Sequence, residues 1–161
     1  MALETLISKR LISFARREFR LDWEGIHGAP HWSRVRHNGL MLAELTGANY
    51  RVVEYFAFIH DLGRLNDNHD PEHGYRAALI AEKIAGDVIE VSQVELALLM
   101  EACQGHSDGH QVADVTVMTC WDADRLDLGR VGIRPDPGRL CTTQAQDAAF
   151  LQEAYRRSIH R

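Results

Sequence analysis

The sequence predicts an all-α fold, a single-domain helical bundle. Segments with helical periodicity follow one another along the chain, and several begin or end on residues that cap helices. Only one apolar segment could also be read as a strand. A chain of 161 residues, 45% of them hydrophobic, can bury a sizeable core. No repeat, linker or low-complexity segment interrupts it, so we expect one domain over 1–161.

The first two helices are expected over 1–19 and 30–47. In the first segment, "MALETLISKRLISFARREF", basic residues separate apolar ones at helical spacing, which predicts an amphipathic helix rather than a signal peptide. The apolar positions are Leu3, Ile7, Leu11 and Phe14. The second segment starts with a proline suited to a first helical turn and ends on a glycine.

The next two helices are expected over 48–63 and 70–86. The first contains "VVEYFAFI", whose β-branched and aromatic residues would also suit a buried strand. Because the sequence offers no other convincing strand, a central helix that is apolar nearly all round is favoured. In the second, Asp70 is the expected N-cap and Pro71 the first helical residue.

Three further helices complete the predicted bundle. Two are expected over 92–103 and 112–129. A stretch rich in proline and glycine, "GIRPDPGRL", comes before the last helix. That helix is expected over about 143–158, because Thr143 and Gln146 have the spacing of a capping box.

Charge and cysteine content narrow the class of protein. The net charge of −5 argues against general affinity for nucleic acid or for an anionic membrane. No apolar run approaches the ~20 residues of a membrane span. The three cysteines are far apart and form no CxxC pair, which is typical of reduced thiols in a cytoplasmic protein. The sequence leaves open whether the chain forms a homo-oligomer.

The stretch "FAFIHDLGRLNDNHDPEHG" contains two His-Asp pairs. His69-Asp70 lies in a polar loop, where Asp70 is better explained as a helix cap. His60-Asp61 ends the most apolar segment of the chain. Burial of both side chains there is costly unless they hydrogen-bond to each other or bind a cation. Both explanations stay open for this pair.

Other residues favour the metal. His31 stands in the first turn of the helix over 30–47, and Asp122 and Asp124 stand near the end of the helix over 112–129. A helical bundle can bring side chains at such helix ends to one point. Two imidazoles and two carboxylates suit a divalent transition metal that keeps positions for water. The scarcity of cysteine argues against a structural zinc site.

Three motifs in this order, "HWSRV", "IHDLGR" and "DADRLDL", resemble the signatures of the HD-domain superfamily of metal-dependent phosphohydrolases. The resemblance covers about 28–129. It implies an HD-type helical bundle and a metal held by His31, His60, Asp61 and a final aspartate. The family pattern "ADR" maps that aspartate onto Asp124. Asp122 is then expected at the surface or beside a ligand.

Some members of this superfamily bind two metals through extra histidines. The matching candidates here are His73 and His106, with His110 in reserve. These histidines have a simpler explanation that stays equally open: His73 could lie in a polar first helical turn, and His106 and His110 could be loop residues. The resemblance therefore implies one or two divalent ions per chain, drawn from Mn, Fe, Ni, Co and Zn.

The resemblance also implies a mechanism in which a metal-activated water attacks a phosphoryl group and arginines hold the phosphate. Arg34 and Arg125 belong to the motifs and are the expected phosphate ligands. Several nucleotide-hydrolysing members carry an acid three positions after the His-Asp aspartate. That position is Arg64 here, which cannot act as a general base, so Asp67 and Asp70 are the candidate substitutes.

The expected function is a metal-dependent phosphohydrolase for a small phosphorylated metabolite or nucleotide. One alternative is a di-iron oxygenase, because a few members of this fold cleave C–C or C–P bonds with two irons. Another alternative is a non-catalytic HD domain that binds a ligand without turnover. The full set of candidate ligands argues against the last of these. Metal content would separate the first two.

Overall fold

The computed structural model describes residues 4–160. In that range the chain forms eight α-helices, two short 3₁₀ helices and no strand, with one isolated bridge between Ala85 and Ile89. The predicted all-α fold is confirmed. None of the described helices is long and apolar enough to cross a membrane. The elements are α1 (Lys9–Glu18), α2 (Ala29–Thr46), α3 (Tyr50–Ile59), α4 (His73–Ile84), α5 (Gln93–Gly105), α6 (Val115–Arg125), η1 (Leu128–Val131), η2 (Pro137–Arg139), α7 (Thr143–Gln146) and α8 (Ala148–Ile159).

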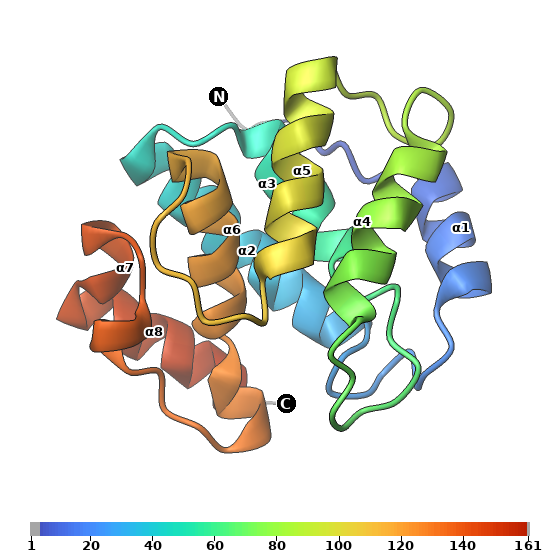
Figure 1. The fold of residues 1–161 in the computed structure, drawn as a ribbon. Coiled ribbons are helices and arrows are strands. Elements are labelled where there is room, and N and C mark those ends of the chain that lie inside the picture. The colour runs from blue at the N-terminus through green and yellow to red at the C-terminus, as the bar shows by residue number, and fades with distance from the viewer. Residues whose placement is uncertain (1–3, 161) are drawn as a thin grey trace.

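Helix α3 is the centre of the bundle, which resolves the ambiguous "VVEYFAFI" segment in favour of a helix. Asn49 caps its start by accepting hydrogen bonds from the backbone N–H groups of Arg51 and Val52. Seven of its ten residues are buried, as expected for a helix that is apolar nearly all round. Helices α2, α4, α5 and α6 pack against it, whereas α1 and the pair α7 and α8 lie at opposite sides of the molecule (Figure 1).

A glycine lets α2 approach α3 and α6 closely. A Cβ atom on Gly39 would lie 2.5 Å from Val53 Cγ1 and 3.4 Å from the Cβ of Ala123. The loop between α2 and α3 is short, so the two helices run antiparallel. The first turn of α2 therefore lies beside the end of α3, and this arrangement brings together the two ends that carry the candidate ligands.

The C-terminal helices cover α2 and α6 through a second, smaller apolar cluster. Its buried members are Leu42, Leu126, Leu140, Ala145, Leu151 and Ala154. The predicted helix over 143–158 is in fact two helices, α7 and α8. Asp147 separates them because its ψ of 128° lies outside the helical region, and its side chain caps α8 by accepting from the N–H of Phe150. Thr142, rather than Thr143, caps α7, so the proposed capping box with Gln146 is wrong.

The starts of α1 and α4 also differ from the prediction. Ser8 caps α1, so the predicted helix over 1–19 is too long, and its first apolar position, Leu3, lies outside the described residues. Asp70 is not an N-cap. Its Oδ2 accepts from the N–H of Leu65 at 2.8 Å, and its Oδ1 pairs with Arg76. The side chain therefore closes the loop before α4.

Candidate metal centre

Six side chains from five segments converge at one end of the bundle. Each lies at or next to a helix end, and all are buried except Asp124, whose side chain is 15% exposed. The six are His31 (α2), His60 and Asp61 (after α3), His73 (start of α4), His106 (after α5) and Asp124 (end of α6). The structure thus brings together the four predicted primary ligands and the two histidines preferred for a second metal, His73 and His106.

The four predicted primary ligands form the first group. His31 Nε2 lies 3.1 Å from His60 Nε2 and 3.1 Å from Asp124 Oδ1. His60 Nε2 lies 3.5 Å from the same Asp124 oxygen. Asp61 Oδ2 completes the group at 3.6 Å from His31 Nε2 and 3.5 Å from His60 Nε2. His31, His60 and Asp61 can therefore face a single ion, and Asp124 Oδ1 lies close to both of these imidazoles.

His73 and His106 form a second group with the other oxygen of Asp61. Asp61 Oδ1 lies 3.6 Å from His73 Nε2 and 3.5 Å from His106 Nε2, and the two nitrogens are 2.9 Å apart. Gly74 permits this approach, because a Cβ there would lie 2.6 Å from the carbonyl oxygen of Cys103 in α5. The Asp61 carboxylate therefore stands between the two groups, with one oxygen toward each.

Hydrogen bonds orient all four imidazoles. Every Nδ1 faces an oxygen that can only accept: Asp127 Oδ2 at 2.7 Å from His31, Phe56 O at 3.0 Å from His60, Asp70 O at 2.5 Å from His73 and Cys103 O at 2.7 Å from His106. Each Nδ1 can therefore donate outward, and each Nε2 is the ring nitrogen that faces the centre. Two imidazole nitrogens about 3 Å apart need a shared proton or a cation between them. The donor set therefore fits a divalent metal ion.

The electrostatics of the cluster favour ionised carboxylates. Burial opposes ionisation of Asp61, yet the neighbouring histidines, His60 first among them, outweigh it and hold the pKa of that carboxyl well below its usual range. Burial likewise opposes ionisation of Asp124, and His31 and His60 hold its pKa well below normal. Burial would lower the pKa of His60, but Asp61 and Asp124 raise it. Burial and the nearby His106 lower the pKa of His73 to about 4.

Sequence reasoning missed Asp127, which holds the first ligand in place. Asp127 is fully buried, accepts from His31 Nδ1 through Oδ2, and accepts from Arg34 Nε through Oδ1 at 2.7 Å. Asp127 follows Asp124 by three residues in "DADRLDL", a spacing that keeps both carboxylates on one side of the chain. Arg34 was expected to bind phosphate; the structure instead pairs it with Asp127 and leaves it out of the cavity described below.

Asp122 and Asp124 have separate surroundings. Asp122 is fully buried and accepts from the N–H groups of Cys141 and Thr142 and from the Thr142 hydroxyl, at 2.7, 2.8 and 2.7 Å. The expectation that Asp122 lies at the surface or beside a ligand is wrong: it ties the C-terminal segment to α6. Of the two aspartates, Asp124 is the one that reaches the cluster, as the family pattern predicted.

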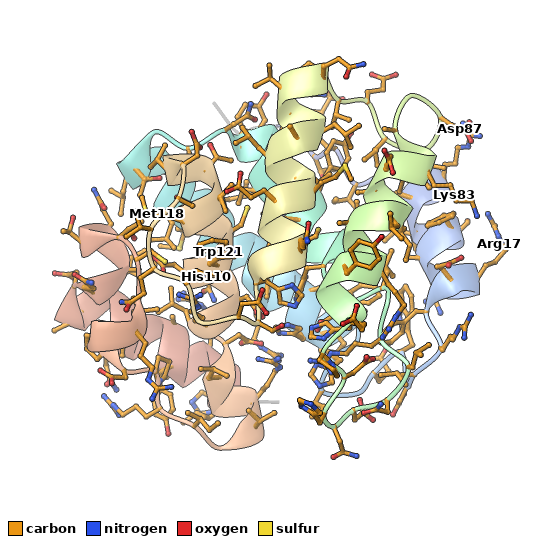
Figure 2. All side chains as sticks on the ribbon, viewed as in Figure 1. Arg17, Lys83, Asp87, His110, Met118 and Trp121 are labelled. Carbon is orange, nitrogen blue, oxygen red and sulfur yellow. The ribbon has the colours of Figure 1, made fainter. Side chains whose placement is uncertain are left out.

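Two other histidines considered from the sequence lie away from the cluster. The His110 side chain is 64% exposed, and its ring lies 6.1 Å from that of Trp121. Figure 2 labels both side chains beside α6. His69 is exposed in the loop before α4. Of the two His-Asp pairs, only His60-Asp61 belongs to the centre.

A cavity of about 970 Å³ adjoins the cluster, and Asp61, His106 and Asp124 form part of its wall. Two predicted catalytic residues also line it. Asp67 is exposed there. Arg125 donates to the carbonyls of His110 and Arg139, with its guanidinium 5.6 Å from the Trp121 ring centre.

Two further residues join the cluster to the cavity. Arg64 donates from Nε to Asp61 Oδ1 at 3.1 Å. The position that is acidic in some HD-domain nucleotidases is therefore occupied here by a hydrogen-bond donor to Asp61. His27 was missed from the sequence. It is buried, its Nδ1 lies 3.2 Å from Asp61 Oδ2 and its Nε2 lies 3.3 Å from the carbonyl oxygen of Asp67. No local motif distinguished it from an ordinary loop histidine.

No protein-family model, curated protein or solved structure matches this chain significantly.

Proposed function

We propose that this protein is a metal-dependent phosphohydrolase of the HD-domain type, acting on a small phosphorylated metabolite or nucleotide. The observation that carries the proposal is the meeting of four imidazole Nε2 atoms with two carboxylates at the wall of a cavity. Arginines line the same cavity. Metal ligands beside cationic side chains are the combination that phosphoryl transfer uses.

The residues divide between holding metal and holding substrate. His31, His60, Asp61 and Asp124 would hold the first ion. A divalent ion bound there lowers the pKa of a water molecule and polarises a phosphoryl oxygen. Arg125 lines the cavity next to Asp124 and offers its remaining N–H groups to the phosphate.

Asp67 is the best candidate for the general base in place of the missing acid at Arg64. Its carboxylate is exposed at the cavity wall, where it can accept a proton from the attacking water. Asp70, the other candidate, has both oxygens occupied by Leu65 and Arg76 and is not part of the cavity lining.

A di-iron oxygenase is the second candidate, and one observation favours it. The Asp61 carboxylate has one oxygen toward His31 and His60 and the other toward His73 and His106, as a ligand shared by two ions would. Imidazole and carboxylate ligands accept iron as readily as other divalent metals, so the ligand types do not separate the two functions.

The test is activity of metal-loaded protein against a panel of phosphate esters and anhydrides, with Mn, Fe, Ni, Co and Zn compared. We expect hydrolysis of at least one ester, loss of activity after chelation, and recovery when metal is restored. The His60→Ala variant should stay inactive under every metal. Two bound irons, O₂ consumption and no phosphatase activity across the panel would replace the hydrolase with the oxygenase.

A further inference from the structure

The cavity beside the candidate metal centre is more basic than the rest of the molecule. The chain has 18 lysines and arginines against 23 acidic residues. Five of the arginines nevertheless line this one cavity: Arg64, Arg125, Arg130, Arg134 and Arg139. Four carboxylates share the lining, but two of them, Asp61 and Asp124, belong to the candidate metal centre.

Three of these arginines have no carboxylate partner. Among residues 4–160, no aspartate or glutamate lies within ion-pair distance of Arg125, Arg134 or Arg139, whereas eight other arginines each pair with a carboxylate. Asp136 lies between Arg134 and Arg139 in the sequence, and its Oδ1 accepts from the N–H of Gly138. Unpaired cations gathered in an acidic protein point to an anion that comes from outside.

The segment that carries Arg134 and Arg139 is held in place by the rest of the fold. Arg134 lies 4.8 Å over the ring of Tyr155 and donates to Gln152 Oε1 at 2.5 Å, both on α8. Arg139 ends η2, where the side chain of Gln111 donates to the carbonyl of Gly138 at 2.8 Å. The Arg134 side chain and the backbone at Arg139 are therefore in place before any ligand arrives, which lowers the entropic cost of binding.

Apolar side chains line the same cavity between its charged residues. They are Ile26, Leu128, Val131, Ile133 and Leu140. The volume of about 970 Å³ is at the upper end of ordinary small-molecule sites, so a phosphoryl group at the metal centre would fill only a small part of it. A ligand with a carbon skeleton fits the remainder.

We propose that the substrate carries two anionic groups. One is the phosphoryl group at the metal centre, and in this respect the inference rests on the proposed phosphohydrolase function. The second, a phosphate or a carboxylate, binds Arg134 and Arg139. The carbon skeleton between the two groups lies against the apolar residues. Guanidinium groups suit this role because they bind either anion through paired hydrogen bonds.

The test uses ligands that the proposed reaction cannot consume. Alkyl monophosphonates with three to eight carbons are compared with the α,ω-bisphosphonates of the same chain length, by calorimetry on the metal-loaded full chain under nitrogen. We expect at least one bisphosphonate to bind about tenfold or more tightly than its matched monophosphonate, from hydrogen bonds to a second charged group. Equal affinity at every chain length would overturn the inference.

Two double variants assign the effect to the named arginines. In Arg134→Gln/Arg139→Gln the bisphosphonate should lose its advantage, while monophosphonate affinity changes by less than about twofold. Arg17→Gln/Arg20→Gln removes the same charge from exposed residues outside the cavity, and the advantage should stay. Figure 2 labels Arg17 on α1, at the edge of the molecule. An advantage that survives in the first double variant refutes the assignment to these arginines.

These outcomes separate this inference from the proposed function. A bisphosphonate preference that depends on Arg134 and Arg139, together with no hydrolysis of any phosphate ester, would support the second anion site and refute the hydrolase. Hydrolysis of phosphate esters without any bisphosphonate preference would refute the second anion site and leave the hydrolase standing. Thermal unfolding of both double variants should match wild type, because all four side chains are exposed.

Discussion

Asp122 and Asp124 should have different effects when each is changed to asparagine, the first on stability and the second on metal binding. Asp122 accepts three hydrogen bonds that tie the C-terminal segment to α6, whereas Asp124 points its Oδ1 at the imidazoles of His31 and His60. We therefore expect Asp122→Asn to lower stability and keep the metal. Asp124→Asn should lose the metal and keep the stability of the metal-free protein.

The size of the Asp122 effect follows from its contacts. An asparagine oxygen can replace Oδ1 and still accept from Cys141, but its amide group would face two donors on Thr142. Two hydrogen bonds to a charged acceptor are lost, and a buried donor meets other donors. The expected cost is about 3 kcal/mol. For a chain of this length it should lower Tm by roughly 6 to 12 °C.

The assay pairs two measurements on each variant. Thermal unfolding of chelator-treated protein, followed by circular dichroism, gives stability, and elemental analysis after dialysis against the metal gives occupancy. Asp108→Asn is the matched control, because Asp108 is half exposed and lies 3.9 Å from the exposed side chain of His110. Full occupancy in Asp124→Asn with metal lost from Asp122→Asn would refute our assignment of the two residues.

Three other changes test separate parts of the account. Asp127→Asn removes the charge that orients His31 and should weaken metal binding about 10- to 100-fold by competition against a chelator; an unchanged affinity would remove Asp127 from the site. Gly74→Ala places a Cβ against the Cys103 carbonyl of α5, which should push His73 away from His106. Metal analysis should then show loss of any second ion while the first ion is retained. Retention of both ions would contradict the role given to the close approach of α4 and α5. Burial opposes ionisation of Glu95, but Ser92, Asn49 and Arg51 together lower its pKa below the usual value of 4.5. The ionised Glu95 side chain therefore stabilises the fold fully at pH values above 4.5. This contribution is lost as the pH falls through the lowered pKa. Wild type should exceed Glu95→Gln by about 1 kcal/mol in unfolding free energy at pH 7, with the gap closing toward pH 3; a constant gap would refute this.

The sequence predicted those parts of the site that depend on local pattern. His31, His60, Asp61 and Asp124 stand in motifs at helix ends, and a bundle that brings these ends together accounts for their meeting. His73 and His106 were candidates for the same reason. Helix α3 was correctly placed because a segment that is apolar nearly all round can only be buried.

What the sequence did not predict depends on contacts between distant segments. Asp70 was expected to be an N-cap because Pro71 follows it, but its oxygens accept hydrogen bonds from the Leu65 N–H and from Arg76 instead. Arg34 was expected to bind phosphate because it belongs to one of the motifs, but it pairs with Asp127 and does not line the cavity. These contacts depend on the tertiary structure, and the spacing of residues along the sequence does not predict them.

The central claim is that these side chains hold metal, and anomalous diffraction from crystals loaded with Mn²⁺ or Fe²⁺ tests it most directly. We predict a first peak bounded by His31, His60, Asp61 and Asp124. A second, weaker peak, if present, should lie between Asp61, His73 and His106 and should vanish in the His73→Ala/His106→Ala variant. An anomalous map with no peak among these six residues, from protein shown to contain bound metal, would contradict the account.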